Sequence, residues 1–221
     1  MNDITLRHDV LDELEYEPSV NAEHIGATVD KGTVTLSGHV KSYAEKQVAI
    51  DAVRRVSGVR AIADDIEVRY DSDKKTSDDE IAKRAVDILA WDSLVPKDAV
   101  TILVRDGWVT LSGKVNWYYQ KKTAEEAVRK LSGVRGIVNN IVIAPTVKSA
   151  DVKRKIEDAL KRHAEIESKS IRVTVKGNDA VLLEGTVDNW DERYAVENAA
   201  WSAPGVRSVE DRLAIGEAKA F

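Results

Sequence analysis

The chain has 221 residues, of which 43% are hydrophobic and 32% charged, a balance typical of a folded protein and not of a disordered or collagen-like one. It contains no cysteine, which excludes disulfides, thiolate metal sites and cysteine nucleophiles. The 33 basic and 38 acidic side chains give a net charge of −5, which argues against a nucleic-acid partner.

Three segments share one pattern, in which alternating apolar residues lead to a glycine. They read TVTLSGHV at 33–40, WVTLSGKV at 108–115 and AVLLEGTV at 180–187. A Gly-Val-Arg anchor follows each segment, so the two glycines of every copy are 20 residues apart: Gly38 and Gly58, Gly113 and Gly133, Gly185 and Gly205. This constant spacing predicts three copies of one unit. We place the domains at 1–70, 76–145 and 148–216.

Each copy predicts a helix, two strands, a second helix and a third strand. Apolar residues three and four apart indicate the helices, and alternation of apolar and polar residues indicates the strands. In the first copy the helical stripes are Leu6, Val10 and Leu14, then Ala49, Ala52, Val53 and Val56; the strands carry Ile25, Ala27 and Val29, then 33–40, then Ile62, Ile66 and Val68. A short turn at Asp30-Lys31-Gly32 makes the first two strands a hairpin.

These elements predict an α+β fold of three tandem αββαβ domains. In each domain two helices pack on one face of a three-stranded mixed sheet, and the other face is left open. The glycines at 38, 113 and 185 interrupt an apolar strand, which indicates a bulge or a close approach by another backbone. The glycines at 58, 133 and 205 are expected to end the second helix.

One polar residue recurs inside the last strand of every copy, as Asp64, Asn139 and Asp211. We expect these side chains to bond to nearby backbone, because Asp and Asn commonly do so and an asparagine cannot act as an acid or base. The sequence therefore predicts a structural role at this position.

The repeats resemble the BON domain, a family named for bacterial osmotic-shock and nodulation proteins. The resemblance rests on the hairpin strand ending in Leu-x-Gly-x-Val, the Gly-Val-Arg anchor and the polar position among aliphatics, and it covers nearly the whole chain. It implies the same αββαβ fold, a role in osmotic or envelope stress, and binding to phospholipid or other envelope components. It implies no catalytic residue. The third copy departs from the pattern, with Glu184 and Pro204 in place of serine.

No catalytic or metal-binding pattern is present in the sequence. The four histidines, His8, His24, His39 and His163, have no second ligand at helical zinc-site spacing. There is also no phosphate-binding glycine loop and no nucleophile elbow. We therefore expect no enzyme activity, no metal and no cofactor.

The middle copy is the best candidate for a contact surface. Residues 80–145 carry 10 basic and 7 acidic side chains, whereas residues 1–70 carry 8 and 13. Basic residues beside aromatic ones suit an anionic membrane interface. The candidate lipid- or partner-contact residues are Trp108, Trp117, Tyr118, Tyr119, Lys121 and Lys122. The competing interpretation is that these aromatics pack inside the protein and the lysines are only solvated.

Two functions remain open from the sequence. One is a non-enzymatic stress-response protein that associates weakly with a phospholipid or membrane surface. The other is a cytoplasmic module that docks a protein partner, or a second copy of itself, on its open sheet faces. The charged N-terminal residues are unlike a signal peptide. We expect a cytoplasmic location, or a periplasmic one if an export signal precedes the chain.

Overall fold

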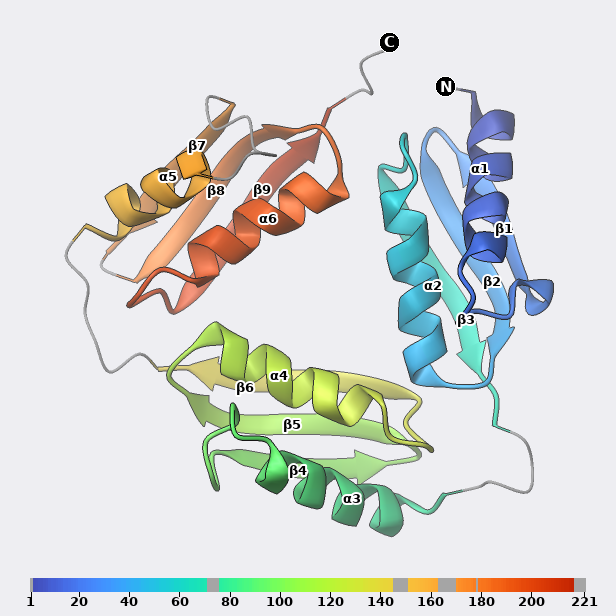
Figure 1. The fold of residues 1–221 in the computed structure, drawn as a ribbon, viewed down its shortest axis with the longest axis horizontal. Coiled ribbons are helices and arrows are strands. Elements are labelled where there is room, and N and C mark those ends of the chain that lie inside the picture. Colours follow the sequence, from blue (N-terminus) through green and yellow to red (C-terminus); the bar gives the residue numbers. More distant parts are fainter. Residues whose placement is uncertain (1, 71–75, 145–150, 163–169, 178, 217–221) are drawn as a thin grey trace. The chain divides into compact units, whose positions relative to one another are not determined.

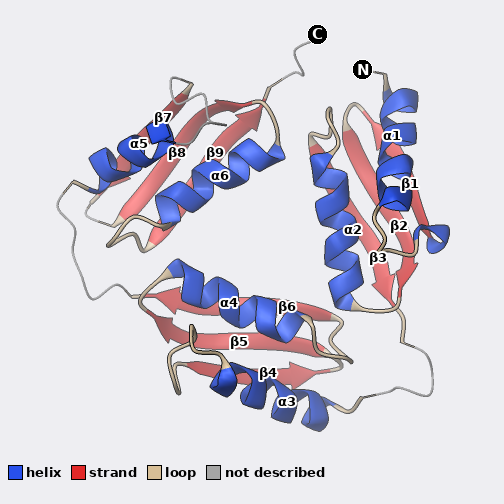
Figure 2. Cartoon of the chain, in the orientation of Figure 1, coloured by secondary structure: helices blue, strands red, loops and turns tan. Residues whose placement is uncertain are grey.

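A computed structural model describes residues 2–70, 76–144, 151–162, 170–177 and 179–216, and it contains three three-stranded sheets (Figure 1). The strand orders are β1-β2-β3, β4-β5-β6 and β7-β8-β9. Each sheet has its own pair of helices, as the colouring by secondary structure makes clear (Figure 2). The predicted fold class, three αββαβ domains, is confirmed.

The elements follow the predicted order in every domain. In the first they are α1 (Asp3–Tyr16), a short 3-10 helix η1 (Ala22–His24), β1 (Ile25–Asp30), β2 (Thr33–Val40), α2 (Tyr43–Arg55) and β3 (Ala61–Val68). In the middle domain they are α3 (Asp78–Trp91), β4 (Val100–Arg105), β5 (Trp108–Val115), α4 (Tyr118–Arg129) and β6 (Gly136–Ile143). In the third they are α5 (Val152–Arg162), β7 (Ile171–Lys176), β8 (Ala180–Val187), α6 (Trp190–Trp201) and β9 (Ser208–Ile215).

The sheets are mixed because a hairpin joins the first two strands and a helix joins the second to the third. β1 runs antiparallel to β2, and β3 runs parallel to β2; β7, β8 and β9 repeat this arrangement. A parallel pair needs a long crossover, which the second helix supplies. The helices cover one face of the sheet, so alternate residues of the central strands are buried beneath them, such as Val34 and Leu36 on β2 and Val109 and Leu111 on β5.

The core of each domain lies between the sheet and its two helices. In the first domain Leu6, Val10 and Leu14 of α1 are buried against strand residues such as Val34 and Leu36. The third domain repeats this with another helical stripe and the corresponding strand positions: Val152, Ile156 and Leu160, with Val181 and Leu183. The apolar periods read from the sequence are thus the buried faces of these elements.

The glycine inside the central strand lies against the backbone of the segment that leads into the first strand. A Cβ atom built at Gly38 would lie 1.9 Å from the carbonyl oxygen of His24. At Gly113 and Gly185 the corresponding distances, to Ala99 and Ser170, are 2.0 and 2.1 Å. All three glycines have a positive φ, between 116° and 142°. The predicted close backbone approach is therefore confirmed.

The Gly-Val-Arg glycines do not end the second helix directly. α2 ends at Arg55, and Gly58, with φ of 92°, lies in the turn that follows. The reason is that Val56 already leaves the helix with extended backbone, and its N–H donates to the carbonyl of Val53. The glycine then lets the chain turn toward β3.

The recurrent polar residue of the last strand joins it to the second helix. Asp64 accepts a hydrogen bond from the N–H of Ile66 (3.1 Å), and its other oxygen lies 2.8 Å from Nζ of Lys46 on α2. In the third domain Asp211 accepts from the N–H of Leu213 (2.7 Å) and pairs with Arg193 of α6 (2.7 Å). The expected bond to local backbone is confirmed at both aspartates, and each also clamps the helix to the sheet.

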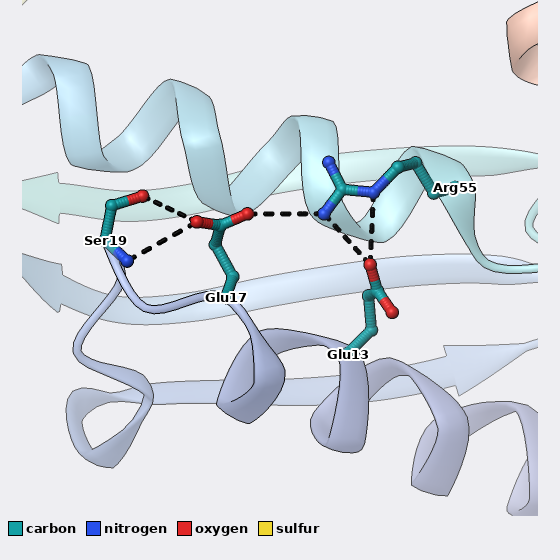
Figure 3. A network of polar contacts seen from close by, with 4 residues as sticks. All are labelled: Glu13, Glu17, Ser19 and Arg55. Carbon is teal, nitrogen blue, oxygen red and sulfur yellow. Dashed lines mark hydrogen bonds and ion pairs between the residues drawn. The ribbon is translucent and has the colours of Figure 1, made fainter.

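A polar network connects the ends of α1 and α2 in the first domain (Figure 3). Arg55 donates from Nε and Nη2 to Glu13 Oε1, at 3.1 and 2.9 Å, and from Nη2 to Glu17 Oε2 at 3.4 Å. The hydroxyl of Ser19 donates to Glu17 Oε1 at 2.7 Å. That hydroxyl, together with the Ser19 N–H, lowers the pKa of the Glu17 carboxyl below its usual 4.5.

Replacement of Gly38 by alanine should destabilise the first domain by roughly 2–4 kcal/mol, because the new methyl group meets the His24 carbonyl and the positive φ strains the backbone. Gly26→Ala is the matched control in the same hairpin. Its Cβ would lie 3.3 Å from the Ser37 hydroxyl, a side-chain atom that can move. Thermal and denaturant unfolding measure both; equal effects would contradict the packing explanation.

Removal of the Ser19 hydroxyl should lower stability in a pH-dependent way. The folded-state pKa of Glu17 is depressed, so its contribution is present above about pH 4.5 and is lost as the pH falls through the folded-state pKa. The difference in melting temperature between wild type and Ser19→Ala should therefore shrink in acid, as followed by calorimetry of the full chain. Ser37→Ala, an exposed serine of β2, is the control. A pH-independent difference for Ser19→Ala would refute the assignment.

Candidate functional site

The aromatic and lysine residues predicted as a contact surface lie at the start of α4. Trp117 directly precedes the helix, and its N–H donates to Oε1 of the buried Gln120 at 3.1 Å. Tyr119 is 49% exposed, whereas Trp117, Tyr118, Lys121 and Lys122 are each half-buried. Most of this predicted surface is thus only partly accessible.

Lys121 occupies a position with a structural role in the other two domains. It is the fourth residue of α4, and the fourth residues of α2 and α6 are Lys46 and Arg193. Those two side chains bind the aspartate of the last strand. In the middle domain the strand residue is Asn139, which donates from Nδ2 to Oε2 of Glu125 on α4 at 3.0 Å. Lys121 therefore occupies the helix position whose side chain, in the other two domains, binds the aspartate of the last strand.

Trp108 lies on the open face of the middle sheet, away from the α4 residues. Its neighbours Val109 and Leu111 are buried, and strand alternation puts Trp108 on the side opposite the helices. The indole lies across the start of β6, because a Cβ at Gly136 would be 2.4 Å from its Cζ3 atom. Trp108 is nevertheless 53% exposed. Trp108 and the α4 residues consequently cannot meet one flat surface together.

Three further apolar residues share the open face with Trp108, and sequence reasoning missed them. Leu103 on β4 and Val138 and Val142 on β6 are 59%, 42% and 53% exposed. Each occupies the strand parity that alternates with buried or half-buried positions. The sequence did contain a signal for them. They are apolar residues at the alternate strand positions that should face away from the helices.

The open faces of the other two domains carry smaller or polar residues at the same positions. Where the middle domain has Leu103, Trp108 and Val138, the first has small residues and the third has mainly polar ones: Thr28, Thr33 and Ala63, and Thr174, Ala180 and Glu210. Among the residues that the structure describes, the large exposed apolar side chains on strands all belong to the middle domain.

A second exposed aromatic of the middle domain ends its first helix. Trp91 is the last residue of α3 and is 90% exposed, and Leu94 in the following segment is 52% exposed. The first domain has an aromatic at the same place, Tyr16 at the end of α1, which is also largely exposed. In the third domain the helix ends in Arg162. The sequence showed only that Trp91 falls late in a helix, not that its ring projects into solvent.

Titratable residues of the described segments form no recognisable reaction centre. His24 and His39 come together as a stacked pair with ring centroids 4.6 Å apart. Yet no group of three or more potential ligands in the described residues is arranged to hold a metal ion. Among the helices of these segments, none combines the length and the apolar character needed to cross a bilayer. The geometry of the described residues therefore supports a binding surface better than a catalytic site.

Comparison with known proteins matches the BON domain to the chain three times, over residues 2–70, 77–145 and 148–217. The osmotically-inducible protein Y of Escherichia coli (strain K12) is 29% identical over 150 residues, which are 64% of this chain and 72% of that protein. Two solved structures of CdsD, a structural protein of the type III secretion system of Chlamydia trachomatis, cover 97% and 98% of this chain and 94% and 100% of their own. They are 17% identical to it, with TM-scores of 0.28 and 0.27.

Proposed function

Because the chain belongs to the BON domain family, with three matches that span nearly its whole length, we propose that it is a non-enzymatic osmotic-stress protein that associates reversibly with anionic phospholipid surfaces. The similarity to an osmotically-inducible protein supports the stress role. The lipid surface is the ligand that best suits the exposed side chains of the middle domain.

The observation that carries this proposal is the exposed Trp91 at the end of α3. Tryptophan is enriched where proteins meet the headgroup region, since its ring is apolar and its N–H can stay hydrated. Leu94 adds a second exposed apolar side chain nearby in the sequence. Residues 80–145 also carry 10 basic and 7 acidic side chains, and each basic residue near an anionic bilayer contributes about 1 kcal/mol. These terms support adsorption to a surface and not insertion.

Replacement of Trp91 by threonine should weaken binding to vesicles of phosphatidylglycerol and phosphatidylcholine by about tenfold, as expected for one large apolar side chain that leaves an interface. Sedimentation with vesicles at low and high salt measures this, and wild-type binding should decline with salt. Tyr16→Thr is the matched control, because it changes the aromatic at the equivalent helix end of the acidic first domain. Equal losses for the two variants would contradict a contact that is specific to the middle domain.

The α4 residues provide the alternative contact surface, which is tested in parallel. A Lys121→Glu and Lys122→Glu double variant that folds normally but no longer sediments, while Trp91→Thr binds like wild type, would move the contact to α4. Absence of wild-type binding to anionic vesicles at any salt concentration would overturn the lipid function. It would favour the docking of a protein partner on the open sheet faces.

A further inference from the structure

The open sheet faces of the first and middle domains carry opposite charge. Over the exposed strand positions of β4, β5 and β6 the charged residues are Arg105 and Lys114, and those positions hold no carboxylate. The first face has Asp30, Asp65 and Glu67 at its open positions, with no lysine or arginine. Glu67 is already paired with Arg69, whereas Asp30 and Asp65 make no ion pair within the described part of the chain.

The same two faces are also complementary in side-chain size. The middle face projects Leu103, Trp108 and Val138, all exposed. The first face has small side chains at the corresponding positions: Thr28, Thr33 and Ala63. Two sheets pack well when large residues of one meet small residues of the other, so that the layers interdigitate at about 10 Å.

The third domain lacks this complementarity. Its open face carries both signs of charge side by side. Glu210 accepts from Lys176 at 2.9 Å and from Nε of Arg212 at 2.8 Å, and Arg172 and Glu184 are register partners on β7 and β8. A face whose charges are already satisfied gains less from a charged partner. This leaves the first and middle faces as the matched pair.

We propose that the open face of the middle domain docks the open face of the first domain in a second copy of the chain. Because each chain has one face of each kind, two chains form the contact twice and close into a dimer. This goes beyond the lipid association, which uses the helix end at Trp91.

The area supports a reciprocal dimer better than a single contact. Strands of about eight residues at about 3.3 Å per residue, three strands wide at about 4.8 Å, give a face of about 26 by 14 Å. One pair of faces then removes only about 700–800 Å² from water, which is the size of a weak contact, whereas two pairs reach about 1,500 Å², a standard specific interface. Charge complementarity selects the acidic first face as occupant, because two middle faces would repel each other.

Two charge-reversal variants of the full chain test the contact by sedimentation velocity. The first-face variant carries Asp30→Lys and Asp65→Lys, and the middle-face variant carries Arg105→Glu and Lys114→Glu. Wild type should dimerise in a concentration-dependent way up to about 0.5 mM, and rising salt should weaken the dimer, since exposed charges steer the contact. Each variant alone should lose at least tenfold in dimer affinity, because both of its contacts then join like charges.

An equimolar mixture of the two variants should dimerise again, since each contact in the mixed pair joins a basic face to an acidic one. Trp108→Thr, which installs the residue found at that place in the first domain, should weaken the dimer at least tenfold. Arg172→Glu on the open face of the third domain is the control and should leave dimerisation unchanged. Circular dichroism checks that every variant is folded.

Several results would overturn the proposal. These are a wild type that stays monomeric over the whole range, a mixture that fails to recover, and growth beyond a dimer. If all proteins remain monomeric and the middle-face variant alone stops sedimenting with anionic vesicles, the open face meets lipid and not a second copy. That outcome would leave the lipid function intact, so the two proposals fail separately.

Discussion

Two helices cover only one face of a three-stranded sheet, and this limit shapes everything else in the molecule. Consecutive residues of a strand therefore differ in burial: one lies under the helices and the next lies on the uncovered face. Val34, Val109 and Val181 are buried under the helices in their domains, and all three are valine. The residues directly before them are Thr33, Trp108 and Ala180, which face away from the helices. The covered face must keep its packing, whereas the open face can change without loss of the fold.

The fold could be predicted from the sequence because each of its determinants is local and periodic. Alternation gave the strands, spacing of three and four gave the helices, and the constant glycine distance gave the repeat. The role of Gly38 was also predictable, since a glycine that interrupts an apolar strand indicates close backbone approach, which the His24 carbonyl provides. The exact ends of the helices were less predictable, because α2 ends before Gly58 through a turn that Val56 initiates.

The candidate surfaces could be predicted only in part, because exposure depends on contacts that strand and helix parity do not specify. Parity placed Trp108 on the open face, but it did not show that the ring lies over Gly136. The basic and aromatic composition at the start of α4 drew attention to Lys121, and only the clamps made by Lys46 and Arg193 reveal the role of that position. Trp91 was placed late in a helix and interpreted as packing between repeats; its 90% exposure could not be predicted, because a residue at a helix end has no fixed partner face.

Several weak contacts made by exposed residues of this chain would together give stronger binding than any one of them. A single tryptophan and a few basic side chains at an anionic surface give only reversible binding. A dimer built from the open faces would carry two copies of Trp91, and the second would bind from an effective concentration in the millimolar range once the first is attached. Surface binding and self-association would then strengthen each other, because a bilayer that holds both chains favours the dimer by linkage. Binding would in this way depend steeply on the concentration of the protein.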